Sequence, residues 1–80
     1  MQRIDILRGA IAPWQEIEVR RSLPQPFSVR HVAAGLGRFL GKHRAGKAAD
    51  LAQEAIRQWH EAGRIEQAGT LDSIPAWRVA

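Results

Sequence analysis

KAADLAQEAIRQWHEA, residues Lys47–Ala62, has the clearest periodicity in the chain. Its apolar residues recur at intervals of three and four, the spacing of one buried stripe on an amphipathic helix. These residues are Ala48, Leu51, Ala52, Ala55, Ile56, Trp59 and Ala62. Gly63 follows at a position where a residue in the left-handed conformation commonly ends a helix. The pattern predicts a helix over residues 47–62.

A cationic loop, Gly41–Gly46, leads into this helix. A helix N-terminus carries unsatisfied N–H groups and a partial positive charge, so a start flanked by Arg44 and Lys47 favours a phosphate. The segment nearly matches the P-loop pattern G-x-x-x-x-G-K-[ST], but Ala48 stands where that motif needs a hydroxyl for Mg²⁺. A preceding buried strand is also missing. We therefore expect phosphate contact without nucleotide hydrolysis.

Length and composition exclude several classes of protein. Eighty residues make one domain, and a hydrophobic content of 45% is ordinary for a folded one. The absence of cysteine excludes disulfides, zinc–thiolate sites and cysteine nucleophiles. Since the N-terminus has no long apolar region and no apolar run approaches the roughly 20 residues of a membrane span, we expect no membrane partner. The expected location is the cytoplasm, or the nucleoid if the chain binds DNA.

The positive charge is concentrated in the middle of the chain. Residues 19–49 hold seven of the 12 Lys and Arg residues and no acidic residue, while the net charge of the whole chain is +4. A block of this length without a carboxylate favours a polyanionic partner. The alternative is a solvated basic surface with no partner.

The first third of the chain is less clearly patterned. Residues 1–12 fit either a short helix or a short strand, and their structure stays open. Pro13 suits the first turn of a helix, and a helix over Pro13–Ser22 places Trp14, Ile17 and Arg21 on one face. The alternation of apolar residues from Ile17 onward is also compatible with a strand, but we favour the helix. Two prolines then end it.

Ser28 is a good N-cap, and Phe27 before it suits a hydrophobic staple. The apolar stripe that follows predicts a helix that ends near Leu36 or continues irregularly to Leu40. Beyond Gly63, residues 64–68 and 76–80 read as two strands of an antiparallel hairpin with a seven-residue loop, Gly69–Pro75. The residues expected to be largely buried are Leu51, Ile56, Trp59, Ile65, Trp77 and Val79.

The order helix, helix, basic turn, helix, hairpin resembles the winged helix-turn-helix family of DNA-binding domains. The resemblance is carried by PFSVRHVAAGLG, by KAADLAQEAIRQWHEAGRIEQ and by AWRVA, and it covers residues 13–80. It implies an α+β fold, mostly helical, with three helices and a C-terminal two-stranded hairpin, the wing. The segment Gly37–Gly46 is longer than the family's usual turn.

The resemblance implies that residues 47–62 form a recognition helix in the major groove of double-stranded DNA. Candidate base-reading residues are Asp50, Gln53, Glu54 and Arg57. Candidate phosphate contacts are Arg30, Arg38, Lys42, His43, Arg44 and Lys47. The implied function is a small regulator of transcription or a phage-type or mobile-element DNA-binding factor.

Three acidic residues count against DNA binding. Asp50 and Glu54 place negative charge on the helix that would approach DNA, and Asp72 lies in a wing loop that has no cation. The alternative is therefore a winged helix that contacts a protein partner, or a second copy of itself, without binding DNA.

No set of residues suggests catalysis. The histidines His31, His43 and His60 are not spaced as metal ligands, and no acidic cluster accompanies them. Glu16 and Glu18 lie two residues apart and would point to different faces of a helix. We expect no enzymatic activity, no metal and no cofactor, and we assign the three tryptophans to the core rather than to base stacking.

Overall fold

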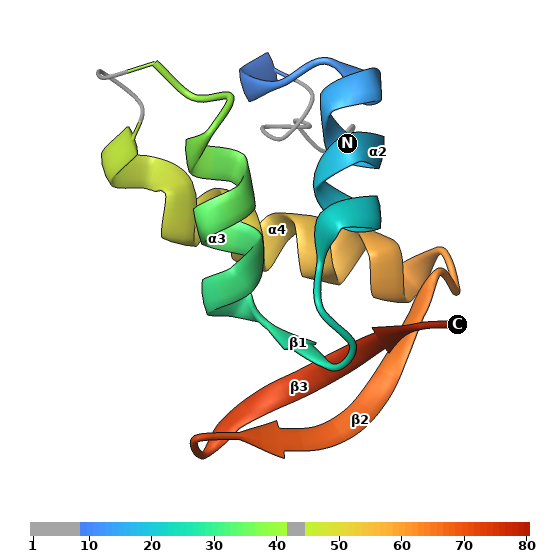
Figure 1. The fold of residues 1–80 in the computed structure, drawn as a ribbon. Coiled ribbons are helices and arrows are strands. Elements are labelled where there is room, and N and C mark those ends of the chain that lie inside the picture. Colours follow the sequence, from blue (N-terminus) through green and yellow to red (C-terminus); the bar gives the residue numbers. More distant parts are fainter. Residues whose placement is uncertain (1–8, 42–44) are drawn as a thin grey trace, which may run out of the picture.

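The computed structural model describes residues 9–41 and 45–80. Its helical elements are α2 (Pro13–Ser22), α3 (Val29–Gly37), the 3₁₀ turn η1 (Ala45–Lys47) and α4 (Ala48–Glu61). Its strands are β1 (Phe27–Ser28), β2 (Ile65–Leu71) and β3 (Ile74–Val79). Figure 1 shows α2, α3 and α4 grouped on one side of the antiparallel sheet. This is a small, helix-rich α+β fold.

Helix α2 has the predicted bounds. Pro13 is its first residue, and the side chain of Gln15 accepts a hydrogen bond from the Ala12 N–H at 2.8 Å. Arg20 and Arg21 lie in its last turn, where cations favour the helix dipole. Of the preceding segment, residues 1–8 lie outside the described part of the chain, and Ile11 is buried in the core.

Helix α3 begins at the predicted cap and ends close to the predicted residue. The Ser28 hydroxyl accepts a hydrogen bond from the Arg30 N–H at 3.3 Å, and His31 Nδ1 accepts one from the Ser28 N–H at 2.9 Å. His31 is exposed, and its side chain completes a reciprocal cap with Ser28. Gly35 allows α2 to approach, since a Cβ there would lie 2.9 Å from Val19 Cγ1.

Among the described elements, helix α4 contributes the largest number of buried residues to the core. Its predicted stripe is confirmed at five positions: Leu51, Ala52, Ala55, Ile56 and Trp59 are buried. The Trp59 indole is 1% exposed, stacks edge-on against Phe27, and donates a hydrogen bond from Nε1 to Glu16 at 2.7 Å. Gly63 has a φ of 72°, which confirms the left-handed turn after the helix.

The sheet corrects the prediction of a two-stranded hairpin with a seven-residue loop. Its strand order is β1-β3-β2, because Phe27 and Ser28 pair with Trp77 and Ala76. Strands β2 and β3 continue to a two-residue turn, Asp72–Ser73, whose positive φ angles of 51° and 66° match the twist of a tight hairpin. A register shift between Gln67 and Thr70 absorbs Gly69, so this turn-like segment belongs to the strand.

The predicted core is partly wrong at the end of β3. Ile65 is buried, but Trp77 is only half-buried and Val79 is 47% exposed. Val79 pairs with Ile65 at the end of β3, two residues beyond the last residue of β3 that pairs with β1, so it lies at the margin of the sheet. Ala76, which the alternation did not select, is fully buried instead.

Candidate nucleic-acid interface and the hollows beside it

In the basic block, residues 19–49, the cations that the structure describes form no ion pair with a carboxylate. Arg30 lies in the first turn of α3, Arg38 follows its last residue, and Lys47 immediately precedes α4; all three are exposed. Within residues 9–41 and 45–80, no ion pair involves any of the three. The guanidinium of Arg38 lies instead 5.9 Å from the ring centre of Phe39. Three further predicted phosphate contacts, Lys42, His43 and Arg44, lie outside the described residues.

The N-cap residue of α4 does not cap the helix with its own side chain. Its N-cap is Lys47, which makes no side-chain cap hydrogen bond, and the acidic residue of the first turn is Asp50. Free N–H groups at a helix start can bind an oxyanion, and Lys47 adds a positive charge. The negative charge of Asp50 opposes this attraction, so whether an anion binds here depends on the cations around the turn.

The four candidate base-reading residues fall into two pairs. Asp50 and Gln53 are exposed, whereas Glu54 and Arg57 bond to one another. Arg57 Nε donates to Glu54 Oε2 at 3.0 Å, its Nη2 contacts the other oxygen of Glu54, and its Nη1 donates to Glu61 Oε2 at 2.8 Å. These bonds, first of all those with Glu54, raise the pKa of Arg57 above its usual value. Arg57 must leave two carboxylates to reach a guanine.

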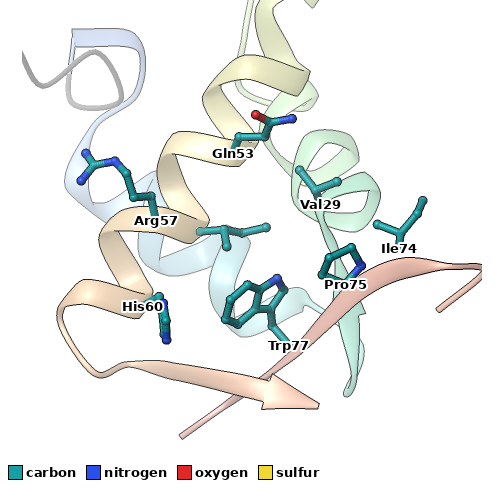
Figure 2. Close-up of a pocket in the computed structure, with 8 residues that line it drawn as sticks. Val29, Gln53, Arg57, His60, Ile74, Pro75 and Trp77 are labelled. Atoms are coloured by element: carbon teal, nitrogen blue, oxygen red, sulfur yellow. The ribbon is translucent and has the colours of Figure 1, made fainter. Parts of the chain in front are cut away.

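An apolar hollow of about 470 Å³ separates α4 from β3. Figure 2 shows Trp77 rising from β3 toward α4, with Val29 of α3 and Pro75 of β3 beside it. The rings of His60 and Trp77 lie 5.0 Å apart, while the guanidinium of Arg57 points away. The hollow was not predicted from the sequence, and neither was the position of Val29 and Pro75 in its lining. A hollow of this kind forms only where elements distant in sequence come into contact.

A second hollow, of about 280 Å³, lies between α2 and the C-terminal end of α4. It is more polar than the first and contains two arginines, Arg20 and Arg64, as well as Glu16 and Gln58. The guanidinium of Arg20 covers the Trp59 ring at 5.8 Å from its centre. This hollow was not predicted either.

The hairpin offers little to an anion. Its turn consists of Asp72 and Ser73, and the cation on β3, Arg78, donates from Nε to Glu66 Oε1 at 2.6 Å. The two residues of the hairpin turn therefore present no cation to a phosphate, and Arg78 is already paired. The described residues contain no helix long and apolar enough to cross a membrane. In the same ranges, no group of three His, Cys, Asp or Glu residues could hold a metal ion.

Comparisons of the chain with models of protein families, with curated proteins and with solved structures give no match. The assignment of function therefore rests on the geometry and charges of the molecule itself.

Proposed function

We propose that this protein is a winged-helix DNA-binding domain that grips duplex phosphates with the α3–α4 turn and the start of α4. The observation that carries the proposal is the unequal pairing of its cations. Arg57 and Arg78 bond to carboxylates, whereas Arg30, Arg38 and Lys47 bond to none in the described part of the chain. Cations left without internal partners can neutralise phosphates and release the counterions of DNA.

The order of elements supports the same function. The α3–turn–α4 unit is followed by a hairpin whose strand β3 lies across from α4, so a groove-binding helix and a wing would face one side of a duplex. Because Arg57 is held by Glu54 and Glu61, direct base reading falls mainly to Gln53. A glutamine can form a bidentate pair with adenine.

The test is a salt titration of DNA binding by fluorescence anisotropy on one mixed-sequence duplex. With about four to six cations at phosphates, log K against log[salt] should slope at about −4 to −5. Arg38→Ala combined with Lys47→Ala should flatten the slope by about one to two units. The matched control is Arg64→Ala, because Arg64 is also exposed and forms no ion pair with a described residue, but lies beyond the other end of α4. Equal losses in both variants would contradict the assignment.

A second candidate function is contact with a protein partner. The apolar hollow between α4 and β3 and the self-paired Arg57 favour it, because DNA needs neither feature. The two functions separate in the same titration. Absence of binding at about 50 mM salt, or a flat salt response, would reject DNA binding and leave the protein partner.

A further inference from the structure

The apolar hollow between α4 and β3 has the size and the lining of a small-molecule site. Its volume of about 470 Å³ falls in the range of roughly 300–1,000 Å³ that such sites occupy. Val29, Ile56, Ile74 and Pro75 give it apolar walls, and the ring of Trp77 forms one side. A molecule that enters the hollow therefore buries apolar surface against three different elements, α3, α4 and β3.

Two hydrogen-bonding side chains in this lining have no partner in the described chain. The indole N–H of Trp77 bonds to none of the described residues, and neither does the carboxamide of Gln53. Figure 2 shows the Trp77 nitrogen on the side of the ring that faces Gln53 and Val29. Solvent reaches this nitrogen, because the described residues include no buried side-chain nitrogen or oxygen without a partner. An oxygen of a molecule in the hollow can therefore accept a hydrogen bond from the indole, and the Gln53 amide can donate a second one.

The lining offers no free counter-charge to an ionised molecule. The described lining contains no carboxylate, and its only Lys or Arg, Arg57, is already bonded to Glu54 and Glu61. Figure 2 shows the guanidinium of Arg57 turned away from the hollow. Because the transfer of an ion from water to an apolar site without a partner is costly, the hollow favours an uncharged molecule.

We propose that this hollow binds an uncharged, planar aromatic molecule that carries a carbonyl oxygen. Its ring packs among Val29, Ile74 and Trp77, and its oxygen accepts the hydrogen bond of the Trp77 N–H. An aromatic ring is favoured because the rings of Trp77 and His60, 5.0 Å apart, offer aromatic surface for stacked or edge-on contact. The site is independent of DNA binding, because none of the described cations assigned to phosphates lies in its lining.

The experiment titrates coumarin, an uncharged fused-ring carbonyl compound, into the ¹⁵N-labelled full chain and follows the indole N–H resonances of the three tryptophans. The Trp77 resonance should shift most, with a Kd of about 0.1–1 mM, since a ligand of so few atoms binds weakly. Coumarin-3-carboxylate, the matched anion, should bind about tenfold more weakly or worse. Equal binding of the two compounds would overturn the proposal. So would a Trp77 resonance that coumarin does not shift, which would leave the hollow to a protein partner.

Three variants test the hydrogen bonds, with the methyl resonances of Ile74 as the readout. Trp77→Phe keeps an aromatic ring but removes the N–H, so it should weaken coumarin binding about three- to tenfold. Trp14→Phe is the matched control, because Trp14 is 63% exposed and lies on α2, so binding should not change. Gln53→Leu alters an exposed position without disturbing the core and should weaken binding about two- to threefold. Equal losses in the two tryptophan variants, or no loss in either Trp77→Phe or Gln53→Leu, would overturn the assignment.

Discussion

The two ends of α4 differ in how their charges are neutralised. Lys47 at the N-terminal end, and Arg38 at the end of α3, are exposed and have no ion-pair partner in the described chain. Toward the C-terminal end, Arg57 is held by Glu54 and Glu61. Lys47 at the start of the helix is therefore available to another molecule, whereas Arg57 is satisfied internally. Arg64, beyond the C-terminal end, also forms no ion pair with a described residue.

The core shows a related asymmetry. Trp59, near the C-terminal end of α4, is buried against Phe27 and bonded to Glu16 of α2. Leu51 is the large buried residue near the N-terminal end, and its neighbours along the helix are alanines or exposed polar residues. We infer that the C-terminal end stabilises the fold and that the N-terminal end serves contact with a partner. The predictions below test this division, from the largest expected effect to the smallest.

The largest effect should follow from removing the buried indole. Trp59→Ala should lower the free energy of unfolding by about 3–5 kcal/mol, because it opens a large cavity. Trp14→Ala is the control: its side chain is 63% exposed, and the loss should stay within about 1 kcal/mol. Urea denaturation at low protein concentration measures both. Similar losses would mean that Trp14 also belongs to the core.

The next effect concerns DNA at the N-terminal end. Arg38→Ala combined with Lys47→Ala should weaken binding by roughly 10- to 100-fold at about 0.1 M salt, since two phosphate contacts are lost. The free energy of unfolding should change little, because both side chains are exposed and neither forms an ion pair with a described residue. Anisotropy titrations and urea melts give the two quantities. A fall in stability without a fall in affinity would assign these cations to the fold.

Freeing Arg57 from one of its carboxylate partners should make its positive charge available to DNA, as the charge of Lys47 is. Glu54→Gln removes one of the carboxylates that hold Arg57 and one negative charge from the outer face of α4. We expect affinity for DNA to rise by up to about tenfold at 0.1 M salt and the salt slope to steepen by about one unit. The control is Glu66→Gln, which frees Arg78 on the hairpin and should change binding less. The reverse ranking would place the duplex on the sheet side.

The smallest effect should come from the hairpin turn. Asp72→Asn combined with Ser73→Gly should raise the free energy of unfolding by about 0.5–1 kcal/mol, because Asn-Gly is the preferred pair for two consecutive positive φ angles. Removing the charge of Asp72 should leave DNA affinity unchanged or slightly higher. A marked loss of binding would instead make the wing the anchor and would contradict the assignment to the α3–α4 turn.

Much of the helical structure could be predicted from local signals. The stripe of α4, the proline that begins α2 and the cap at Ser28 each depend on residues within a turn or two of one another, and all three are confirmed. The unequal distribution of cations was also visible in the sequence. So was the spacing of Glu54, Arg57 and Glu61 by three and four, a pattern of helical ion pairs. The sequence prediction assigns Glu54 and Arg57 to base reading and does not include the ion pairs of Arg57 with Glu54 and Glu61.

The sheet and the hollows required the tertiary structure. Strand β1 is two residues long, too short to show alternation, and it exists because Phe27 and Ser28 meet Trp77 and Ala76 some fifty positions later. The exposure of Val79 also depends on the tertiary structure, since alternation along β3 does not show which of its residues lie at the margin of the sheet. The sequence by itself determined the helices and the basic block, because both follow from neighbouring residues. Only the tertiary structure decided which strands pair, which apolar residues stay exposed and which cations keep no partner, because these depend on contacts between distant residues.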